Sequence, residues 1–515
     1  MKLATQKQIK EIDAFCIEKL DIPMTVLMKS AGEAVAARVR LNAKPGAKVL
    51  ILSGKGNNGG DGYAAACSLF REYEVYVCDV FSQGQRSDAG KHFLSEFMKL
   101  SGKVLFPKSM EEIFRLIKSC DVLVDAIFGT GFSGEIPPEL EALAKIINES
   151  DAPYKIAVDI PLGVNADTGS VSRNAVRVDE TLELSMIKPG VLSYPARSYV
   201  GKITLDTIGV PIERILTEFE FKNNMIDSQF LVSELPLRER NSNKGFFGKL
   251  LMITGSEKYR GAAHLTLEAA LRSGVGYVNF FGERRLNKEL RMKFPEAVYK
   301  KIRRTEKIKS SDIEKILSCS QKSSAILVGS GSSKSGGLFR LVKALSEKEG
   351  APLVLDADAI NALAGEGDVG LCVLKNAKRQ LILTPHPLEF SRISGHSVES
   401  IANNRLELAK SFAKETGVTL VLKGAGSIVT DGDECYINTL GSSSLAKAGS
   451  GDVLAGLVAS FVAEGLNPLK AASLAVGFHA LAADKLDIEF SEFGVTPSDL
   501  PKEIARAIRE SEKQK

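Results

Sequence analysis

Residues 47–62 read AKVLILSGKGNNGGDG, an apolar run that passes directly into a turn with five glycines. A short run of Val, Ile and Leu bounded by glycine predicts a buried strand. The stretch that follows, 62-GYAAACSLF, has apolar residues at helical spacing and predicts a helix. Glycines between a strand and a helix let the backbone approach a ligand, and the first amides of the helix can hold anionic groups. The stretch therefore predicts an α/β domain with a ligand site at its first turn.

The same alternation continues on both sides of this turn. Further apolar runs predict strands, and amphipathic stretches between them predict helices. Two more amphipathic stretches precede residue 47. Strands that alternate with helices form a parallel sheet with helices on both faces. The predicted strands are 74-EVYVCDV, 121-DVLVDAIFG and 154-YKIAVDIP, and the predicted helices are 88-DAGKHFLSEFMKL, 109-SMEEIFRLIKSC and 137-PPELEALAKII.

A second alternating series begins after residue 245. The segment 211–245 between the two series has no clean periodicity, so we place a domain boundary near residues 212–230. The sequence thus predicts two tandem three-layer αβα domains, residues 1–215 and 225–515, and the first is expected to be Rossmann-like. The runs of the second series are 248-GKLLMITGS, 265-LTLEAALRSG, 275-VGYVNFFG, 325-AILVGSG, 352-PLVLDAD, 380-QLILTPH, 418-VTLVLKGAG, 447-KAGSGDVLAGLVASFVAEG and 471-AASLAVGFHALAADKL.

Composition narrows the classes of function. The 515 residues carry a net charge of only +4, with 44% hydrophobic and 25% charged residues, which predicts a globular protein with no nucleic-acid partner. No apolar run predicts a signal peptide or a membrane span. The seven cysteines are scattered without a C-x-x-C pair, which argues against disulfides and a cysteine zinc site. A cytoplasmic location is expected.

The glycine-rich turn has two interpretations. Gly54, Gly56 and Gly59 spell the G-x-G-x-x-G pattern, and Asp79 ends the next strand, as in a dinucleotide-binding dehydrogenase. The additional polar residues argue against a plain dehydrogenase, because a pyrophosphate favours a turn without negative charge. Asn57, Asn58, Gly60 and Asp61 instead suit hydroxyl recognition or a monovalent cation. For Asp61 a helix cap is the alternative.

Two more acids stand at predicted strand ends. Asp125 lies near the end of 121-DVLVDAIFG, and Asp159 immediately precedes a proline turn. Ligands of parallel sheets bind outside the carboxyl ends of the strands, so these ends should line one crevice with the glycine-rich turn. Each acid alone could be a cap, but three adjacent strand ends favour a site.

The order GKGNNGGDG, VDAIFGTGFSG and VDIPLG closely resembles the NAD(P)H-hydrate epimerases over residues 1–210. That family interconverts the R and S forms of pyridine nucleotides hydrated at C6 of the nicotinamide ring. The resemblance implies that Asp159 is the acid–base residue and that potassium binds near Asn58 and Asp125. It implies nucleotide contacts for Asn57, Asn58, Gly59, Gly60, Asp61, Gly129, Thr130, Gly131, Phe132, Ser133, Gly134, Glu135 and Asp159.

One residue departs from the epimerase pattern. The family usually has Ser or Thr after this proline, whereas this chain has Leu162. If potassium needs a hydroxyl there, its affinity should fall. If potassium uses the backbone carbonyl of Leu162, nothing changes.

In the second domain, Gly449, Ser450, Gly451 and Asp452 precede the apolar stretch 453-VLAGLVASFVAEG. Small residues at a helix start leave amides open to a phosphate. A carboxylate beside them can take a proton from a hydroxyl that attacks a phosphoryl group. An N-cap is the alternative for Asp452. G-x-G-D before an apolar helix resembles the ribokinase-like superfamily.

Three further strand ends carry candidate residues. The small-residue turn from Lys423 to Ser427 suits a phosphate or ribose, and His386 lies between two prolines, with a structural role as its alternative. Asp356 and Asp358 end another strand, and capping of a helix around Asn361 is an equal alternative to a site role.

The segments GAAHLTLEAALRSGVG, VGSGS, VLDADAINAL, TPHPLEF, VLKGAGS and AGSGDVLAG, in this order, closely resemble the ADP- or ATP-dependent NAD(P)H-hydrate dehydratases over residues 240–500. Ser332 and Ser333 depart from that pattern, because a further glycine is common there. The resemblance implies the hydrated nucleotide near Ala262, Gly331, His386 and Asp452, and the AMP portion of ADP on Lys423, Gly424, Ala425, Gly426, Ser427 and Gly451.

Together the resemblances imply a bifunctional enzyme that repairs hydrated NADH and NADPH (NADHX and NADPHX). Asp452 would be the catalytic base of an ADP-dependent dehydration that yields AMP and phosphate, with Mg²⁺ in this domain and K⁺ in the epimerase domain. A homo-oligomer is expected. The alternatives are a vitamin or sugar kinase of the ribokinase class, and a non-catalytic nucleotide sensor or scaffold.

Overall fold

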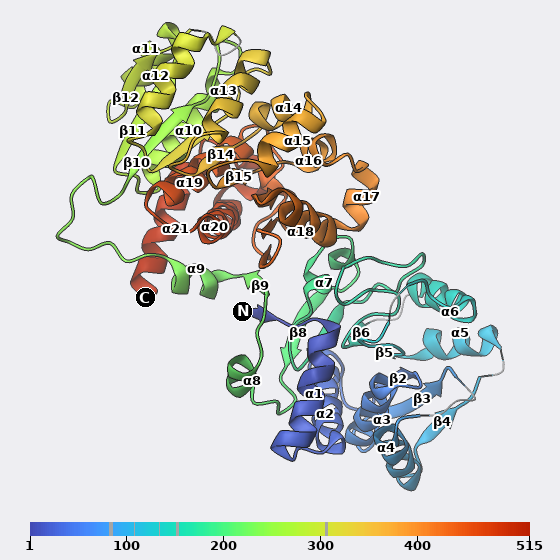
Figure 1. Ribbon diagram of the computed structural model, residues 1–515. Coiled ribbons are helices and arrows are strands. Elements are labelled where there is room, and N and C mark those ends of the chain that lie inside the picture. The colour runs from blue at the N-terminus through green and yellow to red at the C-terminus, as the bar shows by residue number, and fades with distance from the viewer. Residues whose placement is uncertain (82–85, 108, 133, 151–153, 304–306) are drawn as a thin grey trace. The chain divides into compact units, whose positions relative to one another are not determined.

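The computed structural model describes residues 1–81, 86–107, 109–132, 134–150, 154–303 and 307–515 (Figure 1). Its contacts divide the chain into two compact units, Lys2–Asn223 and Asn224–Lys515, and Met1 groups with the second. The domain limits 1–215 and 225–515 stay a prediction.

The first unit alternates strands and helices along most of its length. Its elements are β1 (Lys2–Leu3), α1 (Gln6–Leu20), α2 (Met24–Asn42), β2 (Lys48–Ser53), α3 (Asn57–Leu69), β3 (Glu74–Asp79), α4 (Asp88–Lys99), β4 (Lys103–Leu105), α5 (Met110–Ser119), β5 (Val122–Ala126), α6 (Pro138–Glu149), β6 (Tyr154–Val158), β7 (Glu180–Leu184), α7 (Pro189–Leu192), the 3₁₀ turn η1 (Ala196–Ser198), β8 (Lys202–Asp206) and α8 (Ile212–Glu218).

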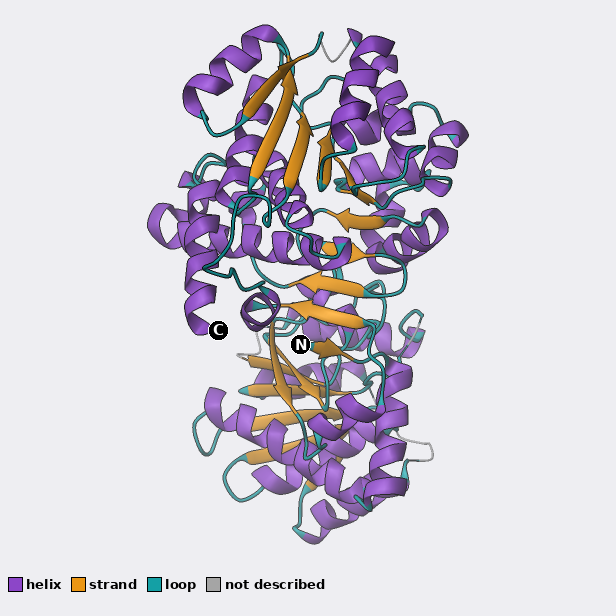
Figure 2. Ribbon diagram, turned by 60° about the vertical axis from the view of Figure 1, so that its left-hand side comes forward, coloured by secondary structure: helices purple, strands orange, loops and turns teal. Residues whose placement is uncertain are grey.

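Its sheet has the order β4-β3-β2-β5-β6-β7-β8, and each neighbouring pair is parallel. Alternate residues of a strand face opposite sides, and both sides of β2 are buried. Val49 and Ile51 pack in a core with residues of α1 to α4, whereas Leu50 and Leu52 pack with residues of α5 and α6. The sheet is therefore the middle of three layers, with helices on both of its faces (Figure 2).

The strand order explains where a ligand can bind in this unit. From β2 the chain moves to β3 and β4 on one side, then returns to β5 on the other side. Parallel α/β sheets open a crevice at such a switch point, at the carboxyl ends of the two central strands. The turn after β2 and the loop after β5 therefore border the same crevice.

The second unit is also an α/β unit. Its elements are β9 (Asn223–Ile226), α9 (Ser228–Glu234), β10 (Lys249–Ile253), α10 (Arg260–Arg272), β11 (Tyr277–Gly282), α11 (Arg284–Lys293), β12 (Val298–Lys301), α12 (Ser310–Ser320), β13 (Ala325–Val328), α13 (Gly336–Ser346), β14 (Leu353–Leu355), α14 (Asp358–Ala364), α15 (Asp368–Lys375), β15 (Leu381–Leu383), α16 (Pro387–Ser394), α17 (Val398–Asn403), α18 (Arg405–Thr416), β16 (Thr419–Leu422), β17 (Ile428–Thr430), β18 (Cys435–Asn438), the 3₁₀ turn η3 (Ser443–Leu445), α19 (Ser450–Ala463), α20 (Pro468–Gly494) and α21 (Leu500–Gln514).

Within this unit the sheet runs β9-β18-β17-β16-β15-β14-β13-β10-β11-β12, with a switch point between β10 and β13. The pairs from β12 to β16 are parallel, whereas β16, β17 and β18 are antiparallel. One face packs on a core built from α10, α19, α20 and α21, which includes Leu250 and Met252. Leu251 and Ile253 point to the other face and are fully buried there.

The predicted fold class, two tandem three-layer α/β domains, is confirmed. One detail of the prediction is wrong, because helix α3 begins at Asn57 rather than Gly62. The segment 211–245 contains α8, β9 and α9, which are too short to show a period. Strand β16 pairs in parallel with β15, as the series predicts, whereas the antiparallel strands β17 and β18 that follow it were not predicted.

The helices of the described residues include none that combines the length and the apolar character needed to cross a membrane.

Candidate active sites

The first unit contains a cavity of about 390 Å³ at its switch point. Helix α1, the turn after β2, the loop after β5 and the end of β6 all contribute to its wall. Eight of the predicted residues lie together in this wall, and four of them come from the loop after β5. The wall includes Asn57, Asn58, Asp61, Gly129, Thr130, Gly131, Phe132 and Asp159, together with Asp13, Gly56, Phe128 and Ser185.

The glycine-rich turn forms the start of α3. Gly56 is the N-cap residue, so Asn57 and Asn58 occupy the first two helical positions and Asp61 the fifth. The helix-cap alternative for Asp61 is therefore wrong, because the cap lies five residues earlier. Burial, together with the negative charges of Asp159 and Asp13, raises the pKa of Asp61 well above its usual value. A carboxyl group in this state can donate a proton at neutral pH.

Gly59 and Gly60 serve packing. A side chain at Gly59 would collide with the Gly54 carbonyl, and one at Gly60 would meet Met28. Neither glycine lines the cavity.

Asp159 is held in a fixed position at the end of β6. Its backbone has φ = +67°, a left-handed conformation that is uncommon for a residue with a side chain. One carboxylate oxygen accepts a hydrogen bond from the Thr130 N–H at 2.9 Å, and the other pairs with the Lys188 ammonium. A side chain at Gly129 would come within 2.8 Å of Asp159, so only glycine fits there.

Lys188 was not found from the sequence. Its side chain is fully buried and also pairs with Glu183 at 3.2 Å. Burial raises the pKa of Glu183 to about 8, while Lys188 opposes this rise. The available signal was a strand, 180-ETLEL, that carries two glutamates and is followed four residues later by a lysine.

Asp13 was missed for a different reason. It belongs to α1, which the sequence marked only as an amphipathic helix in front of the sheet. Its carboxyl lines the cavity, and burial raises its pKa to about 6. Its place on the packed side of a helix, between the buried Ile12 and Cys16, was the signal.

The Asn58 amide lacks a partner. Its side chain is 8% exposed, and within the described residues neither its oxygen nor its nitrogen has a hydrogen-bond partner. Buried amides without partners are rare in folded proteins, so this one points to a ligand or ion. Asp125 is also buried, and it accepts the N–H groups of Ile127 at 3.2 Å and Leu162 at 2.8 Å. Burial raises the pKa of Asp125 to about 6.

Two other predicted segments lie beside the cavity. Ser172 donates to the Gly134 carbonyl, and Glu135 accepts the N–H of Arg173, so both predicted residues hold the neighbouring loop in place. Ser133 lies outside the described residues.

Asp79 accepts the Tyr63 hydroxyl at 2.9 Å and also pairs with Arg86. Burial and these partners argue against ribose recognition by Asp79, which the dehydrogenase interpretation requires.

The second unit has a cavity of about 450 Å³ at its own switch point. It brings together three predicted residues from distant segments, Ala262, Gly331 and Asp452. Asp358, Tyr259 and Gly449 complete much of its wall. Gly331 has φ = +60°, and a side chain there would come within 2.6 Å of the Ala262 methyl.

Asp452 lies in the first turn of α19. Gly449, with φ = +103°, is the N-cap residue, and Asp452 is the third residue of the helix. The N-cap alternative for Asp452 is therefore wrong. Burial raises the pKa of Asp452 to about 7, with a further rise from Asp356 and an opposing effect of Lys423. A carboxyl group with this pKa is suited to act as a general base near neutral pH.

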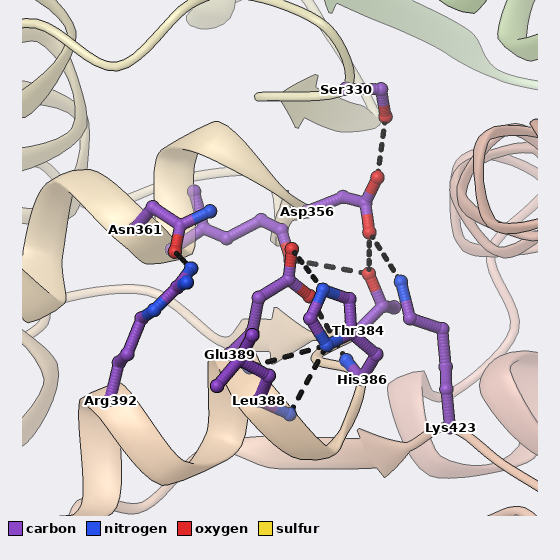
Figure 3. A network of polar contacts seen from close by, with 10 residues as sticks. Ser330, Asp356, Asn361, Thr384, His386, Leu388, Glu389, Arg392 and Lys423 are labelled. Atoms are coloured by element: carbon purple, nitrogen blue, oxygen red, sulfur yellow. Dashed lines mark hydrogen bonds and ion pairs between the residues drawn. The ribbon is translucent and has the colours of Figure 1, made fainter. Parts of the chain in front are cut away.

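Asp356 is the centre of a buried polar network (Figure 3). It accepts the hydroxyls of Ser330 at 2.8 Å and Thr384 at 2.7 Å, and pairs with Lys423 at 3.1 Å. Asp358 accepts the N–H of Ser333 at 2.8 Å. Ala357 is the N-cap residue of α14 and makes no side-chain cap, so the capping alternative for both acids is wrong.

Ser333 occupies a position where the dehydratase pattern commonly has glycine. It has φ = +64°, the conformation in which glycine is usual. The hydrogen bond from its N–H to Asp358, and a contact of its hydroxyl with Ser256 at 3.1 Å, hold it there.

The turn from Lys423 to Ser427 connects β16 to β17. Arg405, which was not predicted, donates to the carbonyl of Ala425 at 2.6 Å and to that of Lys423 at 3.2 Å. The Lys423 ammonium would lie 3.2 Å from a Cβ at Gly451, so the turn and the start of α19 meet at this lysine. Ser427 donates to the Gly424 carbonyl at 2.9 Å. Gly426 lies within the same turn and has φ = +61°.

His386 is the N-cap residue of α16. The imidazole Nδ1 accepts the backbone N–H groups of Leu388 and Glu389. The backbone N–H of His386 donates to the Glu389 carboxylate (Figure 3). The imidazole is half exposed and does not line the cavity. Its contact with the nucleotide therefore stays a prediction, and its structural alternative has direct support.

Both halves of the chain match known families. Residues 250–506 match the family described as NAD(P)H-hydrate dehydratase, and residues 24–190 match the YjeF-related protein N-terminus. The bifunctional NAD(P)H-hydrate repair enzyme of Moorella thermoacetica is 31% identical over 100% of this chain and 98% of its own length. The chain belongs to this family. The Helicobacter pylori member is 33% identical over 98% of this chain and 99% of its own.

A solved ribokinase-like superfamily protein from Enterococcus faecalis V583 shares the fold of the second unit. Its TM-score is 0.50 at 23% identity, over 57% of this chain and 98% of that one. Both family resemblances in the sequence are confirmed, and so is the ribokinase-like fold.

Proposed function

We propose that the chain repairs NADHX and NADPHX in two steps. The domain within residues 1–215 exchanges the R and S hydrates, and the domain within residues 225–515 dehydrates the S form with ADP, giving AMP and phosphate. The observation that carries the proposal is the position of Asp452, a carboxylate of raised pKa in the first turn of α19 and in the wall of a cavity.

Hydroxide is a poor leaving group, so the ring hydroxyl must first be activated. Asp452 takes the proton of the hydroxyl at C6, and the oxygen attacks the terminal phosphoryl group of ADP. The first amides of α19 have no partner within the helix and can hold the phosphates. AMP leaves as the phosphoryl group is transferred. The C6–O bond then breaks with loss of phosphate as the ring nitrogen lone pair forms a cationic C=N bond, and loss of a proton from C5 restores the dihydronicotinamide.

Lys423 and Gly451 place the nucleotide beside this base. The Lys423 ammonium lies at the start of α19, and its ion pair with Asp356 holds it there. The AMP portion would lie on the turn from Gly424 to Ser427. The hydrated nicotinamide would lie between Ala262 and Gly331, with His386 near its edge.

Magnesium fits the second cavity. Asp358 lines it and supplies carboxylate oxygens, which Mg²⁺ prefers, and Asp452 stays free to act as the base. The described residues form no group of three or more acids, histidines or cysteines that could enclose a metal, as expected for an ion that keeps water and phosphate ligands. Bound magnesium would offset charge on the transferring phosphoryl group.

We place potassium at Asn58, which lines the first cavity, and at Asp125, which is buried and does not line it. The unpartnered Asn58 oxygen is available to a cation, and Asp125 supplies a buried carboxylate. Leu162 has no side-chain ligand, and its carbonyl accepts the Val176 N–H at 2.8 Å with one lone pair, so a cation would use the other. Replacing K⁺ with tetramethylammonium should slow R/S exchange, and an unchanged rate would contradict this site.

In the epimerase step Asp159 is the acid–base residue, oriented by Lys188 and Thr130.

We also propose that the protein is cytoplasmic and forms a homo-oligomer.

The test compares ADP and ATP in parallel assays with purified protein, Mg²⁺ and hydrated NADH. ADP should restore the absorbance of reduced nicotinamide and release one AMP and one phosphate for each NADH formed. A stable phosphorylated acceptor without recovered absorbance would contradict the dehydratase and support a kinase.

A further inference from the structure

Asp13 has a position that the proposed function does not use. It lies on α1, three residues before the buried Cys16 and four after the buried Ile9, so it shares their face of the helix. Ile9 lines the first cavity as well. Asp13 therefore forms part of the cavity wall and does not lie on the outer surface of the helix.

The charges around Asp13 come from several elements. Asp61 belongs to α3, Asp159 follows β6, and Lys188 precedes α7. Glu183 lies behind Lys188, and Cys16 on α1 is buried beside Asp13. Lys188 is the one cation that the described residues place against these acids, and its ammonium is bonded to Asp159 and Glu183.

This arrangement gives the acids different surroundings. The Lys188 ammonium and the Thr130 N–H both bond to the Asp159 carboxylate. Asp13 and Asp61 have no such cation within the described residues, and burial together with the charge of Asp159 raises the pKa of each. The cavity thus holds one carboxyl group bonded to a cation and two carboxyl groups that are not.

Inversion at C6 of a hydrated nicotinamide ring needs a group that donates a proton and a group that accepts one. An acid protonates the hydroxyl on one face, the C6–O bond breaks, water leaves, and the ring nitrogen lone pair forms a cationic C=N bond. A second water then adds from the other face as a base takes its proton. One water leaves and one enters, and in the opposite direction the two groups exchange roles.

We propose that Asp13 is a second catalytic acid–base residue of the epimerase, acting from the α1 side of the cavity while Asp159 acts from the strand side. This inference rests on the proposed epimerase function. The unpartnered, buried Asn58 amide in the same wall independently indicates that a polar ligand enters this cavity.

The test is the Asp13→Asn variant of the full chain. Asparagine keeps the size and the hydrogen bonding of the side chain but cannot carry the proton. Chromatography of the two hydrates should show a loss of kcat of about 100-fold or more after subtraction of the spontaneous rate, with KM changed less than about threefold. Asp13→Glu should recover part of kcat, and Glu18→Gln, an exposed acid on the same helix, should match the parent protein.

Two further measurements keep the test decisive. Dehydration of the pure S hydrate by the same Asp13→Asn protein should match the parent rate, which shows that the second unit is folded, and the nearly unchanged KM of exchange shows the same for the first unit. The pH profile of exchange in the parent protein should have two limbs, and the variant should lose one. A parent profile that is flat from about pH 5 to 8 would overturn the proposal, whatever the variant does.

The outcomes distinguish the two claims. If the parent protein does not accelerate exchange, the epimerase function itself fails and the inference falls with it. If the parent protein accelerates exchange and Asp13→Asn stays within about threefold of it, only the role of Asp13 is overturned.

Discussion

Each proposed catalytic carboxylate has a lysine nearby, but the lysines act differently. Lys188 pairs directly with Asp159, and with the Thr130 N–H it holds that carboxylate in one orientation. Lys423 instead pairs with Asp356, and it only moderates the pKa of Asp452, which burial raises to about 7. Asp452 is therefore poised to bind and release a proton, as its proposed role as a base requires.

This difference predicts the pH dependence of dehydration. A base works only when ionised, and the Asp452 pKa lies above its usual value, so turnover with the S hydrate should fall as the pH drops below about 7. The Asp452→Asn variant should lose turnover by about 100-fold or more while still binding ADP in titration calorimetry. Asp368→Asn, an exposed acid of the same unit, is the control. Turnover of Asp452→Asn near the parent rate would discredit the base.

At the scale of the element, the sequence located the sites better than it located the start of each helix. Parallel strand ends meet at one edge, so short apolar runs were enough to predict that Asp159 and the glycine-rich turn line one cavity, whereas Asp125 is buried and does not line it. The three capping alternatives failed because Gly56, Ala357 and Gly449 cap through backbone conformation, which side-chain preferences do not reveal. Asp13 and Lys188 were missed because each comes from a segment whose local pattern is that of an ordinary element.

The start of α19 gives a prediction at this scale. A side chain at Gly449 would have a left-handed φ and would come within 2.6 Å of Leu265, displacing the first turn. Gly449→Ala should therefore weaken ADP binding and lower turnover at least tenfold. Gly465 follows the other end of the same helix, with φ = +94° and open space around it, so Gly465→Ala shares the backbone strain without the collision. Equal ADP affinities in the two variants, measured by calorimetry, would contradict this account.

At the scale of the whole molecule, the proposal joins two reactions in one chain. Because the dehydratase handles only the S hydrate, the R hydrate is repaired only as fast as it is exchanged. The family match covers the full length of the relatives, so both units belong to the same protein in those organisms as well. The sequence predicted this organisation because two different alternating series flank an irregular segment.

Loss of the first activity should therefore change the time course rather than abolish repair. With mixed hydrates, Asp159→Asn should give a fast phase equal to the S fraction, followed by a slow phase at the spontaneous exchange rate. The pure S hydrate should be repaired by this variant at the parent rate. A single fast phase with mixed hydrates would show that Asp159 is not needed.

The most direct measurement follows the absorbance of reduced nicotinamide while the full chain acts on mixed R and S hydrates with ADP and Mg²⁺. The account predicts complete recovery in a single phase, with one AMP and one phosphate released for each NADH. Recovery that stops at the S fraction, or a phosphorylated nucleotide that accumulates in place of NADH, would contradict it.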